Sequence, residues 1–317
     1  MRKGFGLLVV LFLLVAGTFY FNPLWVVDQL IRWKLSQQHV KSEYVQVDGY
    51  RIHYFEAMPA AGGAGTPLVL VHGLGSRGED WSSLIPALAA AGFHVYVPDL
   101  LGYGRSSKPD VDYSISLQEK TVVDFMKAMK IEHADVGGWS MGGWVALKLT
   151  LDQPAMVDRL VAFDASGIYF PARFDASLFT PKDETGLAKL TAMLTPHPMA
   201  LPGFAARAAV RKLQDNAWVL QRSVAAMEGG KDLLDFHLQQ ITRPTLIVWG
   251  SQDTLIPPSV GETMRRQIPG ASMLLVQGCG HLTPAECSKP VLAGTIGFLK
   301  SEPAWVGVDR TVAGEMK

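Results

Sequence analysis

The feature that most constrains the fold is an alternation between short, uninterrupted apolar runs and stretches with helical spacing. Uninterrupted apolar runs are typical of strands buried on both faces of a sheet. Strands that alternate with helices imply a mostly parallel sheet with right-handed crossovers and flanking helices. The expected strands lie in residues 67–73 (PLVLVHG), 93–99, 134–140, 159–165, 244–250 and 272–278.

The alternation stops in the middle of the chain and resumes later. Residues 168–240 contain short helical patterns separated by prolines and no buried-strand pattern, which predicts an inserted helical cap. Ahead of the core, two alternating segments meet at Asp48-Gly49, a strong hairpin signal. The predicted parts are a membrane anchor with an interfacial helix (1–40), two halves of an α/β core (41–167 and 241–301), the cap (168–240) and a loosely ordered tail (302–317).

The N-terminus predicts a membrane segment. Arg2 and Lys3 precede an apolar run over residues 5–21, which spans a bilayer core if it continues to Val27. A short amphipathic helix is expected at 24–35, with aromatic residues suited to the membrane interface. A cleaved signal peptide starts in the same way, but no clear small-x-small cleavage site follows, so we favour a single-pass anchor. Basic residues on both flanks leave the orientation open.

A nucleophile elbow is the first chemical signal. Gly138-Trp139-Ser140-Met141-Gly142 matches the G-x-S-x-G pattern, and it lies between a predicted strand and a predicted helix. This context places a serine hydroxyl on a strained turn, clear of the backbone. The pentapeptide alone is a weak pattern, and its position supplies the specificity. We therefore expect Ser140 to act as a nucleophile.

A serine nucleophile needs a base that is itself oriented by an acid. Asp253 and His281 each follow a predicted strand, in the order Ser, Asp, His that this type of site uses. Asp164 also ends a strand and is the competing acid. We expect the catalytic triad to be Ser140, Asp253 and His281.

An oxyanion hole needs two backbone N–H groups directed at the developing negative charge. The expected donors are Met141, directly after the serine, and Leu74, in the glycine-flanked segment His72-Gly73-Leu74-Gly75. We interpret His72 as a buried organiser of this loop rather than as a base.

Composition limits the classes of partner and cofactor that we expect. Basic and acidic residues balance at 29 each, and no basic stripe is present, so nucleic acid is not an expected partner. No metal-ligand spacing or phosphate-binding glycine loop appears, so we expect no cofactor and no metal. The two cysteines, Cys279 and Cys287, could form one local bridge, although we favour two free thiols.

Together these motifs resemble the α/β-hydrolase superfamily. The resemblance covers about residues 44–299 and is carried by the segments 72–75, 99–106, 138–143, 249–253 and 278–281. It implies the α/β-hydrolase fold and a serine-based hydrolase, since superfamily members with aspartate nucleophiles lack a serine at the elbow. The membrane segment ahead of the domain is similar in layout to membrane-anchored monoacylglycerol-lipase-type hydrolases.

The cap indicates the substrate class. A Met- and Phe-rich lid over a serine elbow suits acyl chains, and a membrane anchor suits lipid substrates, so we expect an esterase acting on apolar or lipid esters. C–C bond hydrolases and perhydrolases remain alternatives, because the segment 72–81 resembles theirs; a non-catalytic binding protein is a further one. The large apolar cap residues are Phe170, Phe174, Phe179, Met193, Met199, Phe204, Met227 and Phe236.

Overall fold

Among residues 17–315, which the computed structural model describes, nine strands form one sheet in the order β1-β2-β4-β3-β5-β6-β7-β8-β9. β2 is antiparallel to both of its neighbours, and every pair from β4 to β9 is parallel. The expected, mostly parallel α/β sheet is therefore confirmed. The strands are β1 (Lys41–Val47), β2 (Tyr50–Ala57), β3 (Thr66–Val71), β4 (Phe93–Pro98), β5 (Ala134–Trp139), β6 (Val157–Phe163), β7 (Thr245–Gly250), β8 (Ser272–Gln277) and β9 (Asp309–Ala313).

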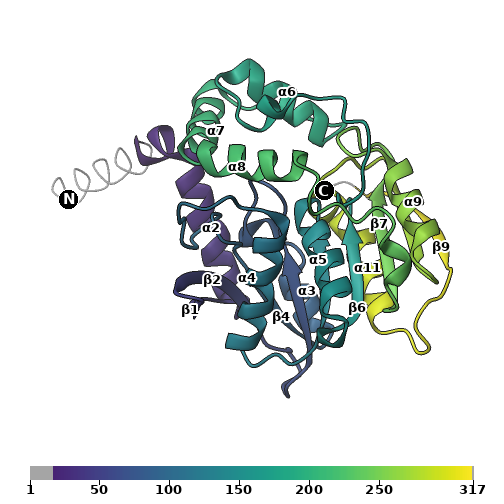
Figure 1. Ribbon diagram of the computed structural model, residues 1–317. Helices are drawn as coiled ribbons and strands as arrows, with labels where there is room; N and C mark the ends of the chain where they lie inside the picture. The colour runs from purple at the N-terminus through teal and green to yellow at the C-terminus, as the bar shows by residue number, and fades with distance from the viewer. Residues whose placement is uncertain (1–16, 316–317) are drawn as a thin grey trace.

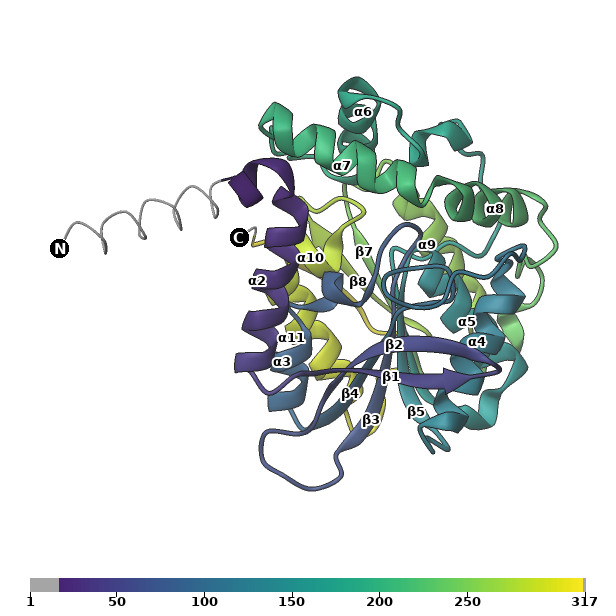
Figure 2. The same ribbon diagram turned by 90° about the vertical axis from the view of Figure 1, so that its left-hand side faces the viewer.

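Helices cover both faces of the sheet, as Figures 1 and 2 show. Side chains alternate between the two faces of the sheet along β3. Val69 and Val71 belong to one apolar cluster, together with residues of α4, α5 and α9. Leu68 and Leu70 belong to the other cluster, together with residues of α3 and α11. An apolar residue is needed at every position of such a strand. The helices flanking the sheet are α2 (Pro23–Gln37), α3 (Ile85–Ala90), α4 (Ile115–Ala128), α5 (Met141–Asp152), α9 (Pro258–Gln267), α10 (Thr283–Glu286) and α11 (Ser288–Leu299).

A helical segment lies between β6 and β7, over the carboxyl ends of the parallel strands (Figure 1). The Asp183 side chain caps α6 (Glu184–Leu194) by accepting a hydrogen bond from the Gly186 amide at 2.7 Å. Residues 164–244 are all described and contain no strand. The segment contains α6 (Glu184–Leu194), α7 (Gly203–Asp215), α8 (Ala217–Glu228) and the 3₁₀ helices η3 (Ala176–Phe179) and η4 (Leu238–Gln240).

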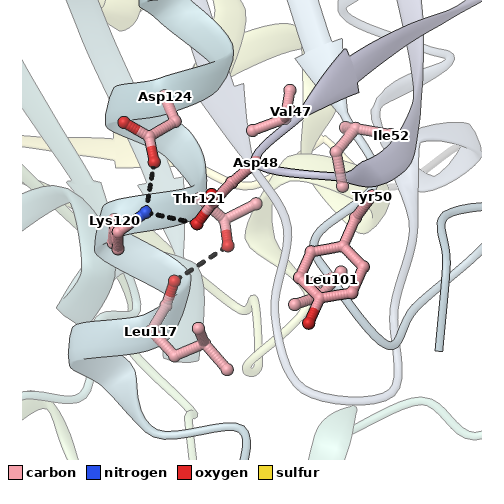
Figure 3. Close-up of a pocket in the computed structure, with 9 residues that line it drawn as sticks. All are labelled: Val47, Asp48, Tyr50, Ile52, Leu101, Leu117, Lys120, Thr121 and Asp124. Atoms are coloured by element: carbon pink, nitrogen blue, oxygen red, sulfur yellow. Dashed lines mark hydrogen bonds and ion pairs between the residues drawn. The ribbon is translucent and has the colours of Figure 1, made fainter. Parts of the chain in front are cut away.

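The β1–β2 hairpin turns at Asp48 and Gly49, which both have positive φ, as the Asp-Gly signal predicts. Figure 3 shows Lys120 of α4 between Asp48 and Asp124, with its ammonium 2.6 Å from each carboxylate. The cavity beside this contact measures about 20 Å³. That volume holds at most about one water molecule, so it is a packing gap rather than a substrate site.

Within the described part of the N-terminal region, residues 23–37 form α2, which includes the amphipathic helix expected at 24–35. Asp28 on α2 accepts hydrogen bonds from Arg77 of the core and from Lys212 of α7. The predicted membrane span lies largely in residues 1–16, outside the described residues. Among residues 17–315, no helix is both long enough and apolar enough to cross a membrane.

The C-terminal region differs from the prediction of a loosely ordered tail. Residues 309–313 form β9, which pairs in parallel with β8 from Met273↔Asp309 to Gln277↔Ala313. β9 is an exposed edge strand containing Asp309, Arg310 and Thr311, so it lacks the apolar run that marked the central strands. Its main-chain hydrogen bonds to β8 hold it in place, and no sequence periodicity signals such bonds.

Candidate active site

Ser140 lies on the turn between β5 and α5. Its backbone has φ 58° and ψ −120°, which is strained for a residue with a side chain. The turn is tight because glycines surround it: a Cβ atom on Gly138 would overlap the Gly142 carbonyl, and one on Gly142 would overlap the carbonyl oxygens of Val71 and His72. The two glycines of the elbow therefore let α5 approach β3 and leave the Ser140 hydroxyl projecting.

The structure brings Ser140, His281 and Asp253 together. The Ser140 Oγ lies 2.9 Å from His281 Nε2, and His281 Nδ1 lies 2.8 Å from Asp253 Oδ2. The other Asp253 oxygen accepts the backbone N–H groups of Leu255 and Ile256, both at 2.9 Å. A proton on Nδ1 satisfies Asp253 and leaves Nε2 free to accept the proton of Ser140.

Asp164, the competing acid, lies elsewhere in the network. Its carboxylate accepts the Gly250 amide at 2.8 Å and the Thr283 hydroxyl, and no described contact joins it to His281. The side chain is fully buried, and burial together with the negative charge of Asp253 raises the pKa of the Asp164 carboxyl well above its ordinary value. Asp164 thus links the loops that carry the other two residues without orienting the imidazole.

The loop after β3 packs directly against the serine. A Cβ atom on Gly73 would lie 3.2 Å from the Ser140 Cβ, so Leu74 is next to a residue in contact with the elbow. His72 is buried: its Nδ1–H donates to the Gly73 carbonyl at 2.9 Å and its Nε2 accepts the Leu100 amide at 3.0 Å. Burial lowers the pKa of His72, which keeps the imidazole neutral, as this pair of bonds requires. His72 organises the loop, as expected.

Comparison with known proteins identifies the family. The model of the family described as "alpha/beta hydrolase fold" matches residues 66–286, which is more than half of the chain. The chain belongs to the α/β-hydrolase fold family. As in other open α/β sheets, its strand-end loops meet at the carboxyl edge of the sheet.

Individual relatives of this α/β hydrolase differ in function. Lipase 1 of Psychrobacter immobilis is 27% identical over 239 residues, covering 70% of this chain and 73% of the lipase. The 2-hydroxy-6-oxo-6-(2'-aminophenyl)hexa-2,4-dienoic acid hydrolase of Metapseudomonas resinovorans is 26% identical over 278 residues, covering 83% and 92%. A solved membrane phospholipase A, described as a bacterial virulence factor, superposes with a TM-score of 0.79 at 24% identity, covering 94% and 98%. That structural likeness shows the shared fold.

Three supporting residues in this α/β hydrolase were not singled out from sequence. The indole Nε1–H of Trp139 donates to the His281 carbonyl at 2.7 Å, and the His281 amide donates to the carbonyl of Leu194, at the end of α6, at 2.8 Å. Asp99 is buried and accepts the Gly78 amide at 2.7 Å, which fixes the chain beyond the Leu74 loop. The elbow motif itself could have indicated Trp139, whereas a main-chain acceptor such as Leu194 leaves no signal in a sequence.

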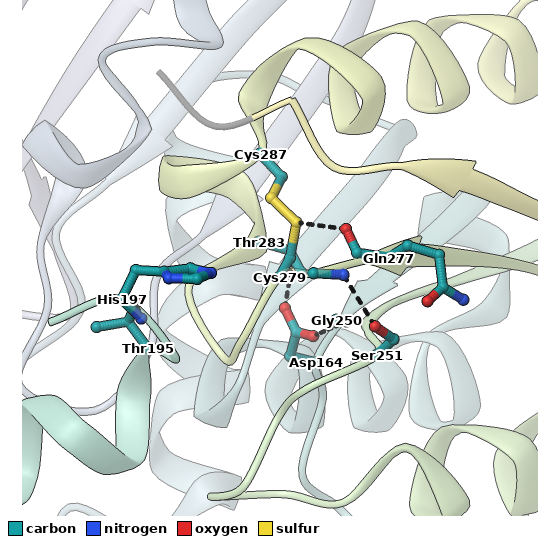
Figure 4. The surroundings of a disulfide bond; sticks show 10 residues. Asp164, Thr195, His197, Gly250, Ser251, Gln277, Cys279, Thr283 and Cys287 are labelled. Carbon is teal, nitrogen blue, oxygen red and sulfur yellow. Dashed lines mark hydrogen bonds between the residues drawn. A yellow bond between two sulfur atoms is a disulfide. The ribbon is translucent and has the colours of Figure 1, made fainter.

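The cysteines differ from the expectation of two free thiols. Cys279 and Cys287 form a disulfide with a Cα–Cα distance of 6.4 Å. Figure 4 shows the bond near Thr283 and Asp164, with His197 and Thr195 nearby. A separation of eight residues allowed either state, and α10 decided the outcome because its turn brings Cys287 back towards the end of β8.

Gly142→Ala should destabilise the elbow, because the new methyl group would overlap two main-chain carbonyls that cannot rotate away. Overpacking of this kind costs about 1–3 kcal/mol or more in unfolding free energy. The measurement is urea unfolding followed by circular dichroism.

Gly229→Ala is the matched control. Gly229 follows α8 with φ −60°, and a Cβ atom there would have its nearest neighbours at an ordinary 3.4 Å. It should leave the unfolding free energy unchanged or slightly raised. Equal stability of the two variants would contradict the close packing described for Gly142.

Proposed function

We propose that the chain is a serine hydrolase that cleaves carboxylic esters, with acyl esters of lipid type as its substrates. The observation that carries the proposal is the hydrogen-bonded series from the Ser140 hydroxyl through His281 to Asp253, at 2.9 and 2.8 Å. A series of this geometry is the arrangement that activates a serine for acyl transfer.

The proposed mechanism uses the side chains of this hydrogen-bonded series. His281 Nε2 takes the proton of Ser140 as the oxygen attacks the ester carbonyl, and then delivers that proton to the leaving alcohol. Water attacks the acyl-enzyme with His281 again as the base, which releases the carboxylic acid and restores Ser140. Asp253 holds the imidazole orientation and stabilises its charged form. We assign oxyanion binding to the Leu74 and Met141 amides; Met141 opens α5, where the helix dipole favours negative charge.

The cap supports an apolar substrate. Phe170, Phe174, Phe179, Met193 and Met227 are partly buried and pack against the main core cluster. Two residues expected in the lid face solvent instead, since Met199 is 82% exposed and Phe236 is 85% exposed. The remaining Phe side chains are apolar and the Met side chains are also flexible, so together they suit acyl chains. The lipase relative supports the same substrate class.

Membrane attachment through the N-terminal segment is part of the proposal. The apolar run over residues 5–21 leads directly into α2, where Trp25, Leu30 and Trp33 are each more than half exposed. Exposed tryptophans next to an apolar segment suit the membrane interface. At the same end, Phe19 and Tyr20 contact Phe204 of α7, so the anchor would enter beside the cap.

C–C bond hydrolysis is a second candidate, and the Metapseudomonas relative favours it. The same triad would serve, with a dienoic acid substrate in place of an ester. A two-substrate comparison separates the candidates. An esterase turns over nitrophenyl acyl esters much faster than a dienoate ring-fission product, and a C–C hydrolase shows the reverse preference.

Ser140→Ala should lower kcat for nitrophenyl butyrate by about 10⁶-fold, because the acyl acceptor is lost. Nitrophenol release measures the effect, and labelling by a fluorophosphonate probe should disappear with it. Ser301→Ala is the control, since the described partners of the Ser301 hydroxyl are the Phe298 carbonyl, at the end of α11, and Arg159. Turnover retained in Ser140→Ala would refute the proposed nucleophile.

Asp253→Asn should lower kcat strongly, whereas Asp164→Asn should leave it nearly unchanged. Asp253→Asn disrupts the acceptor for His281 Nδ1–H, so kcat should fall by about 10⁴-fold. Asp164→Asn replaces a buried carboxyl of raised pKa with a neutral group of the same shape, so kcat should stay near the wild-type value. A steady-state comparison of the two variants tests the assignment, and the reverse pattern would make Asp164 the triad acid.

Deleting residues 1–16 should abolish co-flotation with phosphatidylcholine vesicles while preserving turnover of soluble nitrophenyl butyrate. The physical reason is the loss of most of the apolar run, which leaves too little apolar surface for stable insertion. Flotation in a density gradient measures binding, and ester turnover confirms folding. Undiminished flotation would place the membrane contact outside residues 1–16.

A further inference from the structure

The disulfide encloses the residue that we propose as the base. Cys279 lies two positions before His281, and Cys287 lies six positions after it. Both cysteine side chains are fully buried, in the cluster that contains β8 and α11 residues. The bond therefore fastens one end of the His281 loop to the helix that follows the loop.

The local backbone of this loop does not fix its own path. Gly278 has φ 77° and Gly280 lies on the other side of Cys279, so both neighbours of the cysteine are conformationally free residues. The short helix α10 has only four residues, too few to be stable alone. A covalent tie at Cys279 supplies the constraint that glycines and a single helical turn do not.

Cys279 also connects the base loop to the acid loop. Its carbonyl accepts the amide of Gln252, the residue before Asp253, at 2.9 Å. A shift of Cys279 would therefore move the supports of His281 and Asp253 together. Thr283 lies inside the disulfide loop, and its hydroxyl donates a hydrogen bond to Asp164, which directly follows β6. This bond fastens the loop to the end of β6.

The C-terminal chain covers the bond. The Gly314 amide donates to the Gln277 carbonyl at 2.9 Å, and a Cβ atom on Gly314 would lie 2.6 Å from the Cys279 sulfur. A residue with a side chain would not fit over the disulfide at this position. The segment after β9 thus packs directly against the bond.

We propose that the Cys279–Cys287 disulfide is a positioning device for His281, so that full turnover requires the oxidised chain. The proposal rests on the serine hydrolase function given above. A dithiol reductant would supply two electrons and two protons, break the S–S bond into two thiols and itself become a disulfide. Because such bonds persist in oxidising compartments, the catalytic domain would work on the non-cytosolic side of a membrane.

The test compares wild type with the Cys279→Ala/Cys287→Ala double variant. We expect kcat for nitrophenyl butyrate to fall by about 10- to 100-fold, as for a small displacement of a catalytic group, with KM nearly unchanged. Fluorophosphonate labelling of Ser140 should slow in parallel, because it depends on the same base. Wild-type kcat and labelling rate in the double variant would overturn the proposal.

Val291→Ala is the matched control. Val291 is buried in α11 within the same cluster, and its truncation lowers stability while keeping the bond. It should lower the melting temperature without lowering kcat. If it lowers both as much as the double variant does, the disulfide serves general stability alone and the proposal fails.

Reduction of wild-type protein gives a second measurement that does not depend on folding of a variant. Full-length protein is treated with dithiothreitol and reoxidised with oxidised glutathione, while alkylation and mass spectrometry count free thiols. Turnover should fall as thiols appear and return as they disappear; unchanged turnover in fully reduced, folded protein would overturn the proposal. An oxidised wild type that is not labelled by fluorophosphonate would instead refute the hydrolase function.

Discussion

Close main-chain packing at the elbow is the constraint on which the site depends. Gly142 lies so near the carbonyls of Val71 and His72 that no side chain fits between α5 and β3. This contact holds Ser140 in its strained, positive-φ conformation and brings Gly73 against it. One steric requirement therefore sets the direction of the hydroxyl and the position of the neighbouring loop. The strain at Ser140 persists because the surrounding sheet and helix over-determine it.

The parallel sheet supplies the rest of the geometry. Carboxyl ends of parallel strands lie at one edge, so the loops after β3, β5, β7 and β8 meet there despite their separation in the chain. Two buried carboxyl groups, those of Asp164 and Asp253, lie at this edge, and their hydrogen bonds have different partners. Asp253 holds His281, while Asp164 joins Gly250 to Thr283 and so fastens the loops to each other.

The cap and the disulfide support the same two loops from outside the sheet. The carbonyls of Met193 and Leu194, at the end of α6, accept hydrogen bonds from Thr254 and from the His281 amide. A movement of α6 would thus reach both His281 and the neighbour of Asp253. The disulfide joins the His281 loop at Cys279. Direct hydrogen bonds therefore couple the position of the cap to the positions of the loops that carry His281 and Asp253.

The sequence by itself determined the mostly parallel sheet and the hairpin at Asp48, and it singled out Ser140, Asp253 and His281 as candidate site residues. It could do so because buried strands and tight turns restrict the residue types that a short segment can contain. Tertiary structure alone decided that Cys279 and Cys287 pair, that residues 309–313 join the sheet edge and that Asp164 bonds to Gly250 and Thr283. Each of these outcomes depends on main-chain hydrogen bonds or on the approach of distant segments. Neither leaves a periodic pattern along the chain, so only the folded molecule reveals them.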